Sequence, residues 1–395
     1  MTVTSYTHPP SAPPRRWPSL WSIAVQAVFV AAVFGILGYF VVNAVTAVQS
    51  LGMTTGFGFL ERARAWSLPP SVIESPSSDT YARTLFIAAV NTLVVGLSAI
   101  ILSTLFGFLL GVAQVGRNSL LRGIARTFVQ VFRNIPTIVY VVFIFGIMLN
   151  LPAPRRALNF LDVAFLSNRG LLLPSLQGPG TYWYGLLGIL LAGVTLMLAL
   201  PRPNAAGRHG TPWFRRSWIA IATALSLALF TAGFALFGRF TLSVPELVGF
   251  NFSGGTALSI EVTTLTLAIT LFGTAYIGEI VRGGLISVPK GNLEAASALG
   301  LRPSQVFGYV QIPIALRSIV PALSNQYLYM MKATSLGIVI GYADLFTVAS
   351  LSINYSGQTL EILGLMMLAF IAMNFTLSRI ANFVNARLQF KTNGG

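Results

Sequence analysis

The sequence contains no cysteine, and its two histidines, His8 and His209, lie far apart. Without cysteine the chain forms no disulfide and offers no thiolate to a metal ion, and two distant histidines do not make a metal site. We therefore expect no metal centre. The sequence also contains no GxxxxGKS or GxxxxGKT phosphate loop, no HExxH motif and no GxSxG motif. We therefore expect no catalytic residues and no cofactor on this chain.

Charged residues are scarce as well. Asp, Glu, Lys and Arg make up 9% of the chain, 54% of the residues are hydrophobic, and the mean hydropathy is +0.74. Soluble globular domains contain about 25% charged residues, so this composition indicates a membrane protein. The formal net charge is +15, but the basic residues are scattered between apolar runs instead of forming one patch. This pattern argues against a nucleic-acid partner.

Eight apolar runs are long enough to cross a bilayer as helices, because a hydrocarbon core of about 30 Å needs about 20 residues. They span about Trp21 to Val48, Leu85 to Val115, Phe128 to Leu149, Tyr182 to Leu200, Ser217 to Phe237, Leu258 to Val281, Ile319 to Ile340 and Leu360 to Val384. The first run is too long for the apolar core of a cleaved signal peptide, so we interpret it as an anchor that follows a disordered tail, residues 1–20. The expected fold class is all-α, a polytopic membrane protein with about eight transmembrane helices.

Lys and Arg are distributed unevenly between alternate connections. With the N-terminus inside, the inner segments contain sixteen of these residues and the outer segments contain seven. In membrane proteins the cytoplasmic loops carry the excess of Lys and Arg. We therefore expect both termini, and the polar segment 282–317, to be cytoplasmic.

Segment 282–317, called the elbow below, is a polar stretch between two apolar runs. Pro289 and Gly291 are predicted to interrupt the chain inside this segment, and Asn292 is predicted to cap a short helix, Leu293–Leu299. Glu294 would then lie in the first turn, where the helix dipole favours an anion. A helix of about two turns is marginal alone, so we expect it either to dock on a partner or to be an ordinary connecting loop.

The second half of the elbow has its own start and stop signals. Gly300 is predicted to take the left-handed position that ends the first helix. Pro303 suits the first position of a second helix that runs to about Val310, and Pro313 is predicted to end it.

Three pieces of the elbow carry a family resemblance. Glu294-Ala295-Ala296, then Gly300, then Val310-Gln311-Ile312-Pro313 resemble the EAA signature of the membrane subunits of ATP-binding-cassette importers. Val310 and Ile312 stand where Ile and Leu are usual. Residues on both sides of the elbow resemble the permeases for histidine, glutamine and other polar amino acids: Ala275-Tyr276, Glu279, Arg282-Gly283-Gly284, Asn325-Gln326, Lys332 and Thr334-Ser335-Leu336.

The resemblance implies a role and a set of partners. In that family the elbow is a coupling helix, which sits in a cleft of the cytoplasmic ATPase subunit and passes its closure to the membrane spans. The residues that would couple to the ATPase are Glu294, Ala295, Ala296, Gly300, Pro303 and Pro313. The implied partners are two ATPase subunits that bind ATP, a second identical or related permease, an external solute-binding protein and an L-amino acid, in the bacterial inner membrane.

The resemblance also divides the chain. The family core of five spans would comprise residues 84–149 and 258–390. The helix at 21–48 would be an addition, and residues 150–257 would be an insertion with two extra spans. Larger permeases of general or acidic amino-acid importers are similar in this respect.

An ionisable side chain inside a span is a functional candidate, because placing it in lipid is costly. Lys332 lies near the middle of the seventh apolar run, and Asn325, Tyr329 and Lys332 are spaced to share one helix face. We interpret this face as the border of the solute pathway, where a lysine attracts a carboxylate. The alternative is that Lys332 binds backbone carbonyls or another span and stabilises the bundle.

Several further residues suggest helix contacts. Glu279 and Arg282 are three apart, so an ion pair that anchors the elbow is expected. Arg133-Asn134-Ile135-Pro136 opens the third span and resembles the Arg-x-x-Pro of amino-acid permeases. Gly107 and Gly111 form a GxxxG pair that allows close helix packing. Asn91, Thr92 and Asn374 fit either interhelical hydrogen bonds or the pathway.

A second class of function is kept beside the importer subunit. A stand-alone, ion-coupled secondary amino-acid transporter would also have polar groups inside its spans. Such transporters are commonly built from internal repeats, and no repeat is evident in this sequence.

Overall fold

The structure is a computed structural model of the 395-residue chain and describes residues 20–50, 56–73, 75–177 and 241–388. The chain divides into two units, Met1–Phe57 and Gly58–Gly395. The first unit contains helix α1 (Leu20–Ser50), and the apolar window of this helix has no buried residue. At 1.5 Å per residue, its 31 residues extend about 46 Å, more than a hydrocarbon core requires.

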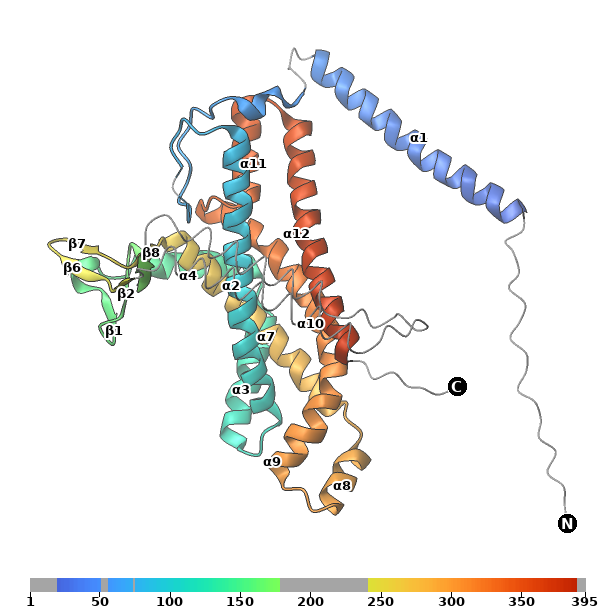
Figure 1. The fold of residues 1–395 in the computed structure, drawn as a ribbon, viewed down its shortest axis with the longest axis vertical. Helices are drawn as coiled ribbons and strands as arrows, with labels where there is room; N and C mark the ends of the chain where they lie inside the picture. Colours follow the sequence, from blue (N-terminus) through green and yellow to red (C-terminus); the bar gives the residue numbers. More distant parts are fainter. Residues whose placement is uncertain (1–19, 51–55, 74, 178–240, 389–395) are drawn as a thin grey trace, which may run out of the picture. The chain divides into compact units, whose positions relative to one another are not determined.

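The second unit is built around two long helices, α2 (Tyr81–Val115) and α7 (Ile260–Ile286), which pack against each other. Helices α10 (Ile312–Ala333), α11 (Leu345–Ser356) and α12 (Thr359–Leu388) complete the bundle. Figure 1 shows the short helices α8 (Lys290–Ala298) and α9 (Pro303–Gln305) at one end of this bundle and α11 at the other. The core between the helices is apolar, with fully buried side chains that include Val95, Leu265 and Ile269.

The GxxxG pair makes the expected close helix contact, and it does so within the chain. Gly107 faces Ile277, and Gly111 faces Val281 and the carbonyl of Gly278. Gln114, one turn further along α2, donates from Nε2 to the same carbonyl at 3.2 Å. The small residues of α2 therefore bring its backbone close to α7.

The third predicted span is not one continuous helix. It is two helices, α3 (Ser119–Arg133) and α4 (Thr137–Leu149), whose axes meet at 103°. Pro136 explains the break, because it lacks an N–H and disfavours helical geometry in Ile135 before it. Tyr140 holds the bend from the other side, since its hydroxyl donates to the carbonyl of Phe132.

The prediction that Pro313 ends the elbow's second helix is wrong. Helix α9 (Pro303–Gln305) continues through a π-helical turn, η3 (Val306–Gln311), into α10, and Pro313 lies in the first turn of α10. In an α-helix the ring of Pro313 would clash with the carbonyl four residues earlier. The wider π-turn, in which Ile312 N–H bonds to Phe307 instead, relieves that clash.

Short strands, which the all-α expectation did not include, lie between α4 and α7. A four-stranded antiparallel sheet has the order β1-β2-β3-β8. Two further strand pairs, β4 with β5 and β6 with β7, flank it. Their bounds are β1 Leu158–Phe160, β2 Ala164–Ser167, β3 Gly170–Leu173, β4 Ser175–Gln177, β5 Thr241–Ser243, β6 Glu246–Val248, β7 Asn251–Ser253 and β8 Thr256–Leu258.

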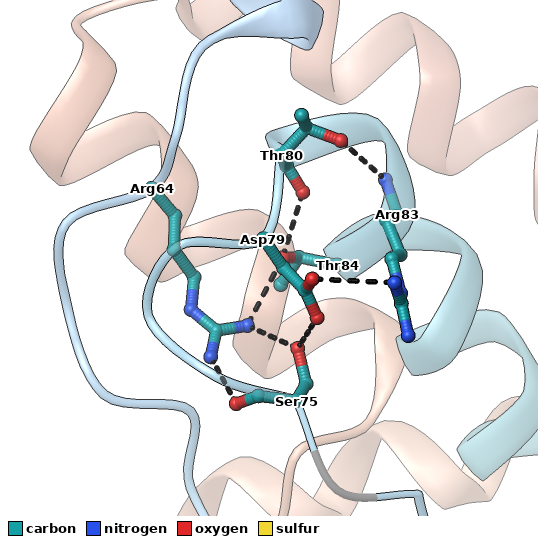
Figure 2. Close-up of polar contacts among 6 residues, drawn as sticks. All are labelled: Arg64, Ser75, Asp79, Thr80, Arg83 and Thr84. Atoms are coloured by element: carbon teal, nitrogen blue, oxygen red, sulfur yellow. Dashed lines mark hydrogen bonds and ion pairs between the residues drawn. The ribbon is translucent and has the colours of Figure 1, made fainter.

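The segment before α2 folds around a buried arginine. Arg64 is 1% exposed, and its guanidinium donates to the Ser75 hydroxyl (2.8 Å), the Ser75 carbonyl (2.6 Å) and the Thr84 hydroxyl (3.0 Å). Figure 2 shows that Ser75 in turn reaches Asp79, whose carboxylate also meets Arg83. Burial lowers the pKa of Arg64, and the nearby Asp79 opposes that effect.

The N-terminal part of α2 joins the turn before α11 through side chains whose role the sequence left open. Asn91 Nδ2 donates to the carbonyl of Ala343 at 2.8 Å, and Thr92 Oγ1 accepts from the Leu345 N–H at 2.9 Å. Asn91 and Thr92 are both fully buried. Their side chains therefore form hydrogen bonds that join α2 to α11 and to the turn before it.

Within the described residues, five helices are long and apolar enough to cross a membrane, or six if α3 and α4 count as one broken span. They correspond to the first, second, third, sixth, seventh and eighth predicted spans. The predicted spans at 182–200 and 217–237 lie outside the described residues. The chain is thus a mostly helical, multi-pass membrane protein, and the number eight stays a prediction.

Candidate functional site

The first helix of the elbow is α8, which runs from Lys290 to Ala298 and begins earlier than predicted. Pro289 occupies the N-cap position, and Asn292 lies inside the helix without acting as its cap. Glu294 is consequently in the second turn and not in the first. Proline suits a helix start because the N–H that it lacks has no intrahelical partner there, so the break predicted at Pro289 is itself the start of the helix.

The end of α8 has the predicted geometry. Gly300 is left-handed, with φ at +80°. Its N–H donates to the carbonyl of Ser297 at 3.0 Å, and the N–H of Leu301 donates to the carbonyl of Ala296 at 3.3 Å. This pair of bonds is the Schellman arrangement, which satisfies the last carbonyls of a helix. Pro303 then occupies the first turn of α9, as predicted, and the Arg302 N–H donates to the Gln305 side chain at 2.9 Å.

One side of the elbow is packed and the other faces outward. Ala296 is buried, and Leu293 is partly buried against the core. Glu294 and Ala295 are exposed, together with two large apolar side chains, Leu299 (83% exposed) and Tyr309 (74%). Neither of these two residues was predicted from the sequence to be functional. A leucine immediately before the helix-ending glycine was the available signal for the first.

Side chains near the end of α7 connect this helix to α3 and to the second half of the elbow. Glu279 and Arg282 form the predicted ion pair, with Arg282 Nη2 and Nε at 2.6 Å and 2.9 Å from the two carboxylate oxygens. Arg133, from α3, joins them at 3.7 Å from Glu279 and lies over the ring of Tyr276. Gln311 Nε2 donates to the carbonyl of Leu285 at 3.1 Å. Three helical segments are therefore held together beside the elbow.

Asn325, Tyr329 and Lys332 lie on one exposed face of α10, as their spacing predicts. We call it the translocation face, after the role that the sequence predicts for it. The ring of Tyr329 also packs on Phe272 of α7, with 5.2 Å between ring centroids. Lys332 forms no ion pair with any residue in the described ranges. An unpaired lysine on an exposed face of a span needs water, a partner chain or a ligand beside it.

Lys332 lies at the point where the helix of the seventh predicted span changes its geometry. It lies in the last turn of α10, and the chain continues as the tighter 3-10 helix η4 (Thr334–Ile340). The hydroxyls of Thr334 and Ser335 donate to the carbonyls of Met331 and Lys332, each at 2.8 Å. Such back-bonding competes with α-helical geometry and accounts for the change at this point.

Lys332 also lines a cavity of about 450 Å³ between α10, α11 and α12. The other lining residues are Ser335, Phe346, Phe370, Ile371 and Asn374. Asn374 donates from Nδ2 to the carbonyl of Phe370 in its own helix, and its buried Oδ1 has no hydrogen-bond partner among the residues that the structure describes. The structure thus brings Asn374 to Lys332, which the sequence could not indicate because the two residues are 42 positions apart.

Comparisons with known proteins agree with this architecture. The family model described as binding-protein-dependent transport system inner membrane component matches residues 103–393. The chain is 37% identical to the putative amino-acid ABC transporter permease protein YhdX of Escherichia coli, over 94% of this chain and 95% of that protein. It is 34% identical to the general L-amino acid transport system permease protein AapQ of Rhizobium johnstonii, over 94% and 93%.

Among solved structures, the chain resembles an amino acid ABC transporter crystallised with histidines, with a TM-score of 0.46 and 17% identity over 78% of this chain and 95% of that one. The family model covers well over half of the sequence, and the relatives align along almost their whole length. The chain therefore belongs to the family of inner membrane components of binding-protein-dependent transport systems, as a membrane-spanning permease subunit.

Proposed function

We propose that this chain forms the pathway for L-amino acids, polar or broad in range, in an ATP-driven importer, and that its elbow couples the pathway to a cytoplasmic ATPase. One observation carries the proposal. From Pro303 to Ile340 the chain is helical without a break, so the second half of the elbow and the translocation face belong to one segment of 38 residues. A displacement of this half of the elbow would therefore move Tyr329 and Lys332 directly.

The partner ATPase would bind the solvent-exposed side of the elbow. Glu294 and Ala295 are exposed there, and Leu299 and Tyr309 offer large apolar surface at the ends of a polar segment. Exposed aromatic and apolar anchors surrounded by polar residues are typical of binding surfaces. The Schellman end at Gly300 holds the two halves of the elbow at a fixed angle, which lets the elbow transmit a displacement.

The translocation face would carry the solute in company with a second permease, identical or related. The exposure of Lys332 supports a second permease beside this face, because a lysine that faced lipid would cost several kcal/mol. Lys332 would attract the carboxylate of an amino acid, and Asn325 and Tyr329 would offer hydrogen-bonding groups along the same path. Two ATPase subunits would bind ATP, and an external solute-binding protein would deliver the amino acid.

The orientation belongs to the same proposal. Both termini and the elbow would be cytoplasmic, as the excess of Lys and Arg in the inner connections predicts. The strands between α4 and α7 would then lie outside, because they precede α7 and the elbow follows it.

The test is reconstitution of the chain in lipid vesicles with the ATPase, binding protein and second permease encoded beside its gene. We expect uptake of radiolabelled amino acids that requires ATP and all of these proteins. Uptake that is driven by a proton or sodium gradient, with no ATPase present, would contradict the proposal in favour of a secondary transporter. Loss of uptake without the binding protein serves as the internal control.

A further inference from the structure

A hairpin between α4 and α7 presents apolar side chains at its tip. Strands β1 and β2 are joined by a turn in which the Val163 N–H donates to the Phe160 carbonyl at 3.1 Å. Leu161, at the centre of this turn, is 94% exposed, and Phe160 and Val163 beside it are exposed as well. We call Phe160, Leu161 and Val163 the apolar tip.

The turn itself is unusual for its sequence. Leu161 and Asp162 both have positive φ, at 58° and 57°, as the two central residues of a type I′ turn do. These positions usually hold Asn, Asp or Gly, because a side chain with bulk is disfavoured in the left-handed region by roughly 1–2 kcal/mol. Asp162 fits that preference and Leu161 does not. A fully exposed leucine at such a position contributes nothing to the stability of the turn.

The hairpin lies next to the membrane by chain continuity. Only Ser259 separates β8 from α7. Residues 150–153 join α4 to the short 3-10 helix η2 (Pro154–Arg156). In Figure 1 the β1 end of the sheet points towards the end of the bundle that carries α8 and α9. From the start of α7 this is the direction in which the membrane spans run, so the apolar tip points along the bundle and not away from it.

Basic side chains stand at the base of the hairpin. Arg155 and Arg156 are exposed, and the Arg155 guanidinium lies 3.5 Å from the centre of the Phe250 ring. Phe250, at the β6–β7 turn, is itself 74% exposed. Apolar side chains with arginines a few residues behind them are typical of segments that lie in the boundary between lipid headgroups and acyl chains.

We propose that the apolar tip inserts into the bilayer surface beside the bundle. Leu161 would lie at the boundary between headgroups and acyl chains, and the arginines of η2 would lie at the level of the lipid phosphates. Asp162 limits the depth, since its exposed carboxylate remains among the headgroups. The strands would thereby brace the bent α3–α4 pair against the membrane. This insertion is independent of which amino acid is carried and of which side of the membrane the hairpin occupies.

A soluble partner protein is the competing occupant of the same surface. It would cover the apolar tip only when it is present, whereas lipid covers it always. The natural absence of cysteine allows a direct test, because one introduced cysteine gives one spin label at a known place. The full chain is placed in lipid nanodiscs, and the label's collisions with oxygen, which partitions into acyl chains, and with a water-soluble nickel chelate are measured.

The three variants are Leu161→Cys, Phe250→Cys and, as the matched control, Asn168→Cys. Asn168 is exposed in the β2–β3 turn, at the opposite end of the strands. We expect the ratio of oxygen to nickel collisions to be at least about threefold higher at position 161 than at 168, with 250 between them. Equal ratios at 161 and 168, or a label at 161 that is shielded only after a binding protein is added, would overturn the proposal.

Discussion

A β-carbon placed on Gly111 would lie 2.5 Å from the β-carbon of Val281, closer than such atoms approach in real proteins. Gly107 has the same relationship to Ile277, at 2.7 Å. These two glycines lie one turn apart on α2, and the α7 residues that they meet lie four positions apart. The contact between α2 and α7 therefore depends on the absence of two side chains, and it lies beside the Glu279–Arg282 ion pair of α7.

Replacing Gly111 with valine should separate these helices. The β-carbon meets the side chain of Val281 and the carbonyl of Gly278, so one helix must shift. We expect the free energy of unfolding to fall by about 1–3 kcal/mol, as for other overpacked sites. Gly146→Val is the control, because a β-carbon at that helical glycine meets nothing within 4 Å. The measurement is thermal unfolding in nanodiscs, and equal stability of the two variants would contradict the close packing.

Gly300→Val tests the elbow through its backbone alone. No atom lies within 4 Å of a β-carbon at Gly300, but its φ of +80° disfavours valine by at least about 1–2 kcal/mol. We expect roughly tenfold less amino-acid uptake per ATP hydrolysed, since 1.4 kcal/mol is a factor of ten in the population of the correct elbow. The control is Gly300→Asn, because asparagine tolerates the left-handed region. Normal coupling in the valine variant would refute the role of this turn.

The features that the sequence predicted correctly depend on local backbone rules. Gly300 was predicted to be left-handed because a left-handed glycine commonly ends a helix, and Pro303 was predicted to begin the next helix because proline suits the first position. Glu279 and Arg282 meet because residues three apart share a helix face. Each of these follows from a few neighbouring residues.

The features that it missed depend on distant contacts. The strands are short, and β3 pairs with β8 across more than eighty residues, so no alternation of apolar and polar residues in the sequence indicates them. Pro313 was expected to end a helix because a π-turn that accommodates the ring cannot be read from composition. The cavity that joins Lys332 to Asn374 exists only because α10 packs against α12.

Lys332→Met should weaken transport and leave the subunit folded. The lysine is exposed and forms no ion pair within the described ranges, so its loss breaks no contact of that kind. We expect uptake to fall by at least about tenfold, because a hydrogen bond to a charged group contributes about 1.5–3 kcal/mol and each 1.4 kcal/mol is a factor of ten. Lys332→Arg keeps the charge and should retain more activity. Thermal stability separates the alternatives, because a lysine that only stabilises the bundle would lower it in the methionine variant.

Asp344 should make the stability of the chain depend on pH. Its carboxylate is fully buried at the N-terminus of α11, where it accepts from the N–H groups of Phe346 and Thr347. Burial outweighs these hydrogen bonds and raises the pKa of Asp344 from 3.8 to about 6. Between these two values the folded chain binds more protons than the unfolded chain. The free energy of unfolding therefore decreases as the pH rises from about 4 to about 6, and this contribution is constant above that range.

Asp344→Asn removes this dependence and keeps the helix cap, since asparagine caps helices about as well as aspartate. We expect the slope of thermal stability between pH 4 and 6 to be smaller in the variant than in the unmodified chain, measured in the same nanodiscs. Glu246→Gln is the control, because it makes the same acid-to-amide change at an exposed position of β6. A slope that is the same in all three proteins would mean that Asp344 remains ionised throughout, held so by the hydrogen bonds of the cap.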